Sequence, residues 1–333
     1  MATMADVARV AGVAGSTVSH VLNGTRNVSE ATRGRVLEAM DTTGYRYNSL
    51  ARSLAVSKTR TIGLSISVLT NPYFGSLVNA IEKRARAEGY TLVLGDSHDD
   101  AENELRVVNS LLDRRVDGLI VAPSAGAQEA TLPVIAKAGT PVVLIDRFLD
   151  AECDQVEPEN VGPARRITEH LLEKGHTRVG AISGLPGLQT STERLQGFRE
   201  AFAARGLRYD EALVASGESQ AEAARTAVLG LFRRSDPPTG LVVLNNAMTI
   251  GTMQALRELE LRVPDDVALV CYDDFEWADL FEPRLTAIAQ DVVTMGATAV
   301  EMLLRRLAGD AGPARKLRIP TTFNHRNSCG CRP

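Results

Sequence analysis

The sequence predicts a small all-α headpiece followed by an α/β body that contains two doubly wound parallel sheets. The first 45 residues have the apolar spacing of three short helices. From Thr61 the pattern changes to short continuous apolar runs separated by helix-like stretches, in two series, 61–146 and 178–290. Continuous apolar strands are typical of parallel sheets that helices cover on both faces. Two series therefore predict two subdomains with a cleft between them.

Capping signals mark the ends of the first two predicted helices. Thr3 can cap the first helix, with Asp6 three positions later in a box-like arrangement, and Gly12 ends it. The second helix extends over about 15–22 and stops at the Asn-Gly pair 23–24.

The third predicted helix occupies about 29–44, and its spacing turns Val36, Leu37 and Met40 inward. Residues 48–55 also have helical spacing, but this segment is too short to hold as a helix alone.

Residues 4–21 have the composition that a helix-turn-helix requires. Ala8 allows two helices to cross closely, and Gly12 accepts the positive φ of the tight turn. Valines of both helices fill the small core: Val7, Val13, Val18 and Val21. The second helix is then free to lie in the major groove of DNA. A small alanine-rich helical pair with no nucleic-acid partner fits the same stretch.

Charge is divided unevenly along the chain. Residues 1–60 hold eight Lys or Arg and four Asp or Glu, which is a net charge of +4. Because the whole chain has a net charge of −4, the remaining residues carry −8. A basic unit on an acidic body suits nucleic-acid binding, although one basic stretch is often only a solvated surface.

Several functional classes find little support in the sequence. No segment reaches the roughly 18 apolar residues of a membrane span, and the start lacks the pattern of a secretory signal, so a cytoplasmic protein is expected. GAISG (180–184) is neither a dinucleotide fingerprint nor a P-loop, and no catalytic triad order stands out, so we expect no enzyme and no cofactor. Cys329-Gly-Cys331 lacks a His or second Cys pair at zinc spacing, which favours ordinary thiols and no metal.

Polar residues close three of the predicted strands: Asp146, Asn245 and Asp273. Ligands of such folds bind outside the carboxyl ends of the strands. A carboxylate there can accept two bonds from the neighbouring hydroxyls of a sugar or polyol. Each residue fits equally well as the cap of the helix that follows it.

Residues 12–55, GVAGSTVSHVLNGTRNVSEATRGRVLEAMDTTGYRYNSLARSLA, resemble the headpiece and hinge of the LacI/GalR family of bacterial repressors. The similarity continues in order through NPYF (71–74), PVVLIDR (141–147), CYDDF (271–275) and RNSCGC (326–331), and it covers essentially the whole chain. The resemblance implies a sequence-specific repressor with a periplasmic-binding-protein-like body, controlled by a small-molecule effector.

The resemblance also implies boundaries and partners. A recognition helix reads only a short half-site, so we expect a homodimer on palindromic operator DNA, without the leucine-rich tail of tetrameric relatives. The implied parts are a headpiece (1–47), a hinge and linker (48–59) and an effector-binding and dimerisation domain (60–333), whose subdomains are about 60–158 with 290–319, and about 159–289 with 320–333.

Implied DNA contacts lie in the headpiece and the hinge. Ser16 and His20 carry most of the base readout, because Gly15 stands at a base-reading position without a side chain. Ala14 replaces the usual capping serine, which removes one bond worth roughly 1 kcal/mol. Leu54 matches the leucine that wedges into the minor groove, although ordinary linker packing would also explain it. The implied set is Thr3, Gly15, Ser16, Thr17, Ser19, His20, Asn23, Ala51, Arg52 and Leu54.

Implied effector contacts lie around the cleft: Tyr73, Phe74, Asp146, Arg147, Thr190, Arg194, Asn245 and Asp273. Two acids and an amide indicate a neutral sugar or polyol, while the two arginines leave a sugar acid or sugar phosphate open. Leu188 replaces the arginine of purine-binding relatives, which disfavours a purine. The alternatives are a solute-binding or sugar-processing protein of the same fold without a transcriptional role.

Overall fold

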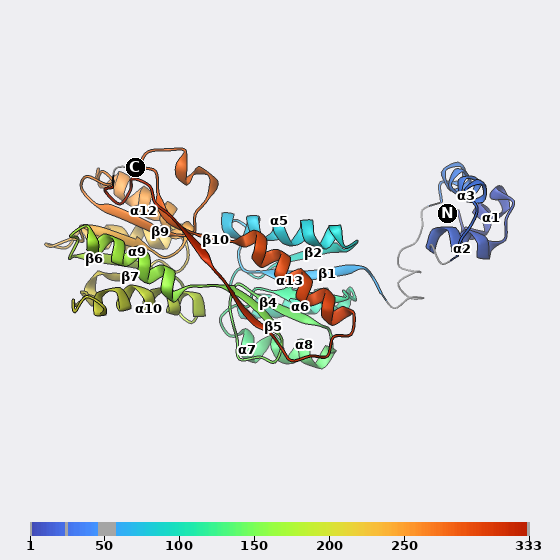
Figure 1. Cartoon of the computed structure of the whole chain (residues 1–333), viewed down its shortest axis with the longest axis horizontal. Coiled ribbons are helices and arrows are strands. Elements are labelled where there is room, and N and C mark those ends of the chain that lie inside the picture. The colour runs from blue at the N-terminus through green and yellow to red at the C-terminus, as the bar shows by residue number, and fades with distance from the viewer. Residues whose placement is uncertain (1, 24–25, 46–57, 332–333) are drawn as a thin grey trace. The chain divides into compact units, whose positions relative to one another are not determined.

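The computed structural model describes residues 2–23, 26–45 and 58–331, with only the backbone at Asn23. The chain divides into two compact units, Met1–Thr59 and Arg60–Pro333, and each is described by itself. Figure 1 shows the helices of the first unit and the two α/β subdomains of the second. The fold class predicted from the sequence is confirmed.

The headpiece contains α1 (Met4–Ala11), α2 (Gly15–Asn23) and α3 (Glu30–Thr43). Thr3 and Asp6 form the capping box, and Gly12 ends α1 with a φ of 63°. One apolar cluster joins the three helices: Val7, Ala8, Ala11, Val18, Val21, Val36 and Ala39. The helix-turn-helix pair predicted from small and β-branched residues is therefore present.

One predicted core residue of the headpiece lies outside. Leu37 is 48% exposed, whereas Val36 and Ala39 are buried and Met40 packs against them. Positions 36, 39 and 40 form one stripe with the i, i+3, i+4 spacing of a helix, and residue 37 points away from that stripe. The prediction that Leu37 turns inward is wrong.

The first sheet of the effector unit has the order β11-β5-β4-β3-β1-β2, and every neighbouring pair is parallel. The helices α5, α6, α7, α8 and α13 belong to this half. Its elements are β1 (Thr61–Ile66), α5 (Pro72–Ala87), β2 (Thr91–Asp96), α6 (Ala101–Asp113), β3 (Gly118–Val121), α7 (Ala127–Ala130), α8 (Leu132–Ala138), β4 (Val142–Ile145), β5 (Asp154–Pro158), α13 (Val292–Leu307) and β11 (Lys316–Ile319).

The second sheet has the order β12-β10-β9-β8-β6-β7, and only its edge strand β12 is antiparallel. Two short 3₁₀ helices, η1 and η2, accompany four α-helices. The elements are α9 (Val161–Glu173), β6 (Val179–Ser183), α10 (Gln189–Ala203), η1 (Glu211–Leu213), β7 (Val214–Ser216), α11 (Ala221–Phe232), β8 (Gly240–Val243), α12 (Asn246–Glu258), β9 (Ala268–Tyr272), η2 (Glu276–Asp279), β10 (Thr286–Gln290) and β12 (Thr321–Asn324).

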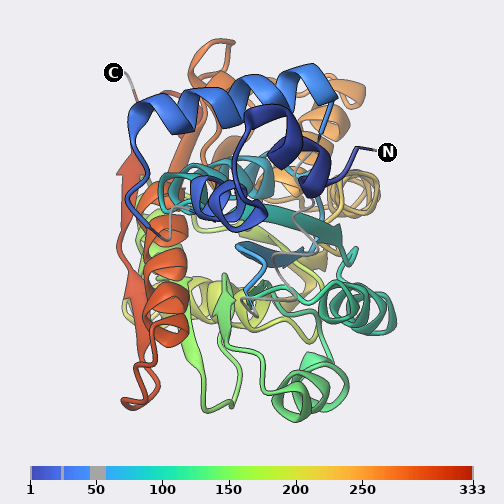
Figure 2. The same cartoon turned by 90° about the vertical axis from the view of Figure 1, so that its right-hand side faces the viewer.

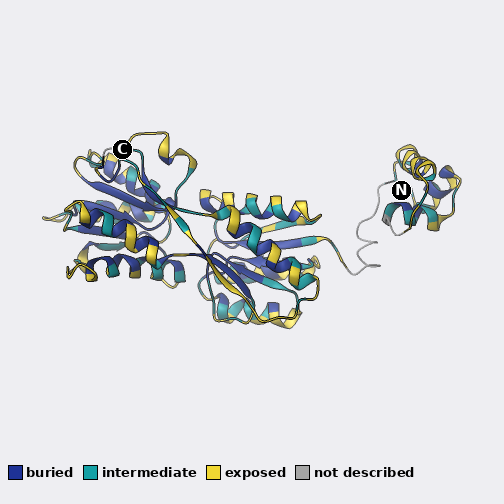
Figure 3. Ribbon diagram, viewed as in Figure 1, coloured by how far each residue is buried: buried dark blue, intermediate teal, exposed yellow. Residues whose placement is uncertain are grey.

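Helices cover both faces of the first sheet. Along β4, Val143 and Ile145 pack into a cluster with α5 and α13, whereas Leu144 packs into a cluster with α6 and α8. This alternation follows from the two-residue period of a strand. Figure 2 shows α13 in red on one side of the strands and α6 to α8 in green tones on the other, and Figure 3 shows buried strands beneath helices with exposed outer surfaces.

The chain passes between the two sheets three times, after β5, after β10 and after β11. The connecting segments, close to residues 159, 291 and 320, lie together where the two halves meet in Figure 1. Each half is thus built from separated stretches of sequence. Among the described residues, no helix combines the length and apolar character needed to cross a bilayer.

Candidate effector site and DNA-reading helix

A cavity of about 40 Å³ lies at the carboxyl ends of the strands of both sheets. All eight residues implied as effector contacts line it: Tyr73, Phe74, Asp146, Arg147, Thr190, Arg194, Asn245 and Asp273. A wider cavity, of about 350 Å³, shares Tyr73, Asp273 and Gln290 with it and adds the aromatic pair Phe275 and Trp277.

Two aspartates occupy matching positions in the two subdomains. Asp146 follows β4 and Asp273 follows β9, and their φ angles are 75° and 72°. A positive φ is uncommon for residues other than glycine, and such strain gathers at functional sites. Both carboxylates are buried, and both line the cavity.

Tyr73 binds the first of these carboxylates. The side chain of Asn71 caps α5 by accepting from the amide of Tyr73, and the Tyr73 hydroxyl donates to Asp146 at 2.6 Å. Burial and the neighbouring Asp146 carboxylate raise the pKa of Tyr73 well above its usual value, so the hydroxyl keeps its proton. Phe74 contacts the Tyr73 ring edge-on, with 5.0 Å between ring centroids.

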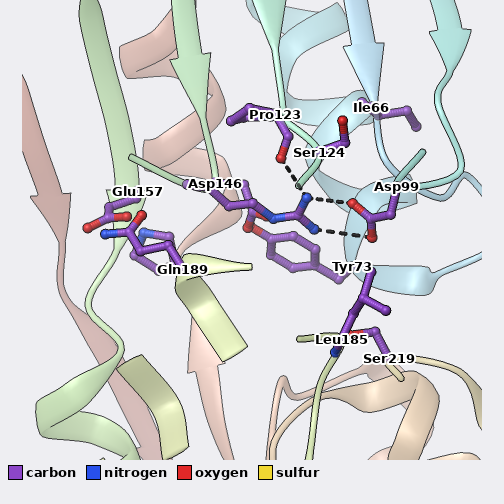
Figure 4. A network of polar contacts seen from close by, with 12 residues as sticks. Ile66, Tyr73, Asp99, Pro123, Ser124, Asp146, Glu157, Leu185, Gln189 and Ser219 are labelled. Atoms are coloured by element: carbon purple, nitrogen blue, oxygen red, sulfur yellow. Dashed lines mark hydrogen bonds and ion pairs between the residues drawn. The ribbon is translucent and has the colours of Figure 1, made fainter. Parts of the chain in front are cut away.

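Arg147 holds this corner of the first subdomain together. Its guanidinium donates to Asp99 at 2.5 Å and to the Pro123 carbonyl at 2.7 Å, and its Nε lies 3.2 Å from Asp146. The bonds to Asp99 and Pro123 are drawn as dashed lines in Figure 4, where the ring of Tyr73 lies beside them. Burial lowers the pKa of Arg147, but the carboxylates of Asp99 and Asp146 outweigh it and raise the value. These partners all lie in the first subdomain, so Arg147 is fixed within one half of the effector unit.

Arg194, on α10, is the buried guanidinium beside the strand-end aspartate of the second subdomain. The Nε atom of Arg194 donates to Asn160 Oδ1 at 2.9 Å, and its Nη1 atom donates to the Leu244 carbonyl at 2.9 Å. The same Nη1 lies 3.7 Å from Asp273, and the guanidinium stacks 3.8 Å from the ring centre of Tyr272. Each strand-end aspartate therefore has a buried guanidinium next to it.

Asp273 also receives a bond from Gln290, whose amide nitrogen lies 2.5 Å from the carboxylate. Burial raises the pKa of Asp273, and Arg194 opposes the rise. The sequence interpretation missed Gln290 and Asp99 as cavity residues. Gln290 is the last residue of β10, so the strand-end rule applied to the other three strands would have found it.

Two implied contacts have local structural roles as well. The Oδ1 atom of Asn245 accepts from the amide of Met248 and caps α12, so part of its hydrogen-bonding capacity is used within the chain. Thr190 lies in the first turn of α10, next to buried Leu188, and both line the cavity.

A second network joins the subdomains behind the cavity. The amide of Phe148 donates to Glu157 at 3.1 Å and to Gln189 at 2.6 Å, and the last two lie close together in Figure 4. Arg318 contacts Glu157 at 2.7 Å and Glu193 at 2.6 Å, which links β5 to α10. Burial and then repulsion from Glu193 raise the pKa of Glu157 to about 8, against the opposing charge of Arg318.

The headpiece presents the recognition helix α2. Gly15 and Ser16 are exposed, and Thr17, Ser19 and His20 are partly buried. A side chain added at Gly15 would meet open space. The hydroxyl of Thr3 donates to and accepts from Asp6 in the capping box. The Asn23 side chain, Ala51, Arg52 and Leu54 lie outside the described residues.

Comparisons with known proteins match both units. Residues 3–48 match a model described as bacterial regulatory proteins, lacI family, and residues 168–329 match a periplasmic binding protein-like domain. The chain is 34% identical to the HTH-type transcriptional repressor PurR of Photobacterium profundum over 92% of each chain. It is 34% identical to the ribose operon repressor of Escherichia coli K12 over 98% of this chain and 100% of that one. A Lac repressor dimer bound to operator and an anti-inducer superposes with a TM-score of 0.87 at 28% identity, covering 98% of this chain and 99% of that one.

Proposed function

This chain belongs to the LacI family of bacterial regulatory proteins and is a DNA-binding repressor controlled by a small-molecule effector, and we propose that the effector is a neutral sugar or polyol. The observation that carries the proposal is the single cavity lined by all eight implied contacts, with a carboxylate at each of two matching strand ends. Carboxylates paired with guanidinium groups accept bonds from ligand hydroxyls without an uncompensated buried charge.

The charges around the cavity favour a neutral ligand over an anionic one. Its lining contains three acids and two arginines: Asp99, Asp146, Asp273, Arg147 and Arg194. Each arginine already has carboxylate partners. A sugar acid or sugar phosphate would enter with no unpaired guanidinium to receive it. The ribose operon repressor among the relatives supports a carbohydrate. Leu188 lies in the lining in place of the arginine that the resemblance implies for purine-binding relatives, which disfavours a purine.

A thermal-shift screen of the full chain tests this proposal. Pentoses, hexoses, polyols, sugar phosphates and purine bases are compared, and we expect a neutral sugar to raise the melting temperature. A ligand at 100 times its Kd stabilises by about 2.7 kcal/mol. Asp273→Asn and Arg194→Lys should lose the shift and the effector response while they retain operator binding. Asp113→Asn, at the exposed end of α6, is the control.

A shift produced only by purines would overturn the sugar assignment. An unchanged effector response in both cavity variants would place the effector elsewhere in the molecule. Assays of sugar turnover distinguish the repressor from the alternative of a sugar-processing enzyme, and we expect them to detect no product.

We further propose that two copies pair through the effector unit. Leu280 and Phe281, after η2, are 72% and 67% exposed, and a cavity of about 530 Å³ beside them is lined by Met253, Leu261 and Val263. Contiguous exposed apolar surface marks interaction sites. The similarity to a Lac repressor dimer supports a second copy of this chain as the occupant, on a palindromic operator in the cytoplasm.

We propose that residues 1–47 form the DNA-binding headpiece, 48–59 the hinge and linker, and 60–333 the effector-binding and dimerisation domain. In this arrangement Ser16 and His20 read bases, and Thr17, Ser19 and Asn23 position the helix on phosphates. The exposure of Gly15 and Ser16 supports the assignment of α2 as the reading helix.

A further inference from the structure

Four potential metal ligands converge in the second subdomain, away from the effector cavity. His170 lies on α9, His325 follows β12, and Cys329 and Cys331 lie in the terminal segment. One atom from each, two imidazole nitrogens and two thiol sulfurs, lie within 4.8 Å of one another. The two cysteines are buried and His170 is partly buried.

The sequence alone favours ordinary thiols, because no histidine stands at zinc spacing, whereas the structure places two histidines beside the cysteine pair. His325 precedes Cys329 by four positions, so these two residues are also close in the sequence. His170 is brought to the pair only by the packing of α9 against β12, at a distance in sequence that no motif covers.

The spacing of the ligand atoms fits a tetrahedral ion. Zinc bonds of about 2.3 Å to sulfur and 2.0–2.1 Å to nitrogen place neighbouring ligand atoms about 3.3–3.8 Å apart. The distance from Cys329 Sγ to His325 Nε2 is 3.4 Å, and that from Cys331 Sγ to His170 Nε2 is 3.6 Å. Thiol–imidazole hydrogen bonds would explain each pair separately, but they do not explain why both pairs meet.

The surrounding backbone holds the two cysteines in place. Gly330 between them has a φ of 83°, and its amide donates to the Asn327 carbonyl at 3.0 Å. The carbonyl of Ser328 accepts from the amide of Leu269 in β9, and the amide of Ser328 donates to the carbonyl of Arg284. The hydroxyl of Thr286 donates to Cys329 Sγ at 3.3 Å, an outer-shell bond of the kind that orients metal ligands.

We propose that His170, His325, Cys329 and Cys331 form a structural zinc site that fastens the terminal segment to α9. Two thiolates and two imidazoles are the ligands that tetrahedral Zn²⁺ selects among common ions. Four protein ligands leave no open position, so the site stabilises the fold and performs no catalysis.

Metal analysis of the full-length chain tests the proposal. Protein purified from zinc-supplemented cells under reducing conditions should contain one zinc per chain by mass spectrometry of the metal. After chelation, Co²⁺ should restore one ion per chain, with visible bands of tetrahedral geometry and an ultraviolet thiolate-to-cobalt band. The double variant Cys329→Ser/Cys331→Ser should lose the metal, and His170→Ala should bind it more weakly. Cys153→Ser and His98→Ala, at a half-buried thiol and an exposed imidazole elsewhere, are matched controls that should retain one zinc.

Three results would overturn the site. They are zinc content near zero in the native chain, zinc content equal in the double variant and the controls, or a native chain lighter by two hydrogens because Cys329 and Cys331 form a disulfide. The cobalt spectrum of the unaltered chain remains decisive even if the variants fold poorly. The effector screen is a separate measurement, so failure of one proposal does not affect the other.

Discussion

At the scale of single residues, the two strand-end aspartates carry the most information about function. Asp146 and Asp273 both have a left-handed backbone, which costs on the order of 1–3 kcal/mol at each position. The conformation turns each carboxylate into the cavity, where it meets a guanidinium and a neutral donor, Tyr73 or Gln290. The site has thus been built twice, once in each subdomain, with the same chemistry.

Glu157 makes stability depend on pH. Its pKa in the folded chain is about 8, above its ordinary value of 4.5, because it is buried next to Glu193. The folded state therefore holds this proton more tightly than the unfolded state does. The stabilisation is fully present below pH 4.5 and is lost as the pH rises through 8.

We expect the melting temperature of the effector unit to fall by several degrees between pH 6 and pH 9. In Glu157→Gln this fall should be smaller, because the amide cannot ionise. Glu159→Gln, at an exposed neighbouring position, is the control. If calorimetry gives the same fall in melting temperature with pH for the native chain and for Glu157→Gln, Glu157 does not hold the proton.

Residue types at strand ends were predictable from the sequence, but their partners were not. The strand-end rule found Asp146, Asn245 and Asp273 because a change from apolar to polar residues is visible in the letters. The same letters fitted a helix cap equally well, and they could not decide that Asn245 both caps α12 and lines the cavity. Nor could they show that Arg147 bonds within its own subdomain, because its partners depend on the path of the backbone after the strand.

At the scale of elements, the buried apolar strands β1, β3, β4 and β9 were predicted, and β5 was missed. Its sequence, Asp154 to Pro158, reads DQVEP, yet every residue is buried. Arg306 pairs with Asp154 through two bonds of 2.7 Å, and Arg318 pairs with Glu157. Hydrophobic patterning cannot detect a strand whose buried acidic residues are bonded to arginines that lie far away in the sequence.

The close approach of α11 and α12 depends on Gly251. A Cβ atom added there would lie 1.9 Å from the carbonyl oxygen of Ala221, a backbone atom that cannot move aside alone. Gly251→Ala should therefore destabilise the effector unit by about 1–3 kcal/mol. Gly230→Ala, on α11 with open space around it, should stabilise by up to about 1 kcal/mol. Urea unfolding measures both, and a neutral Gly251→Ala would show that the helices separate easily.

The hinge prediction belongs to this scale, although residues 48–55 lie outside the described residues. Two such segments that pack together on an operator would push both Leu54 side chains into the minor groove. Leu54→Ala should weaken specific binding and reduce DNA bending, while salt-dependent non-specific binding changes little. Circular-permutation bending assays measure the change in DNA bending. Arg46→Ala in the basic headpiece is the comparison: it should weaken salt-dependent non-specific binding and leave DNA bending little changed.

At the scale of the whole molecule, pairing determines the strength of operator binding. Phe281→Asp should yield a monomer in light scattering at micromolar concentration, because it places a charge within the exposed apolar surface. Loss of the second headpiece should lower operator affinity by roughly 100-fold or more. Leu207→Asp, at another exposed apolar position, should remain dimeric. A stable native monomer, or a dimeric Phe281→Asp, would exclude this surface.

The three passages between the sheets determine when the molecule becomes competent during its synthesis. The first sheet receives its edge strand β11 only at residues 316–319, and the second receives β12 at 321–324. Until these two strands have been synthesised, both sheets of the nascent chain are incomplete and the third connection is missing. A headpiece that folds on emergence would precede a finished sensor. The DNA-reading unit is therefore synthesised well before the strands that complete both sheets of the effector unit.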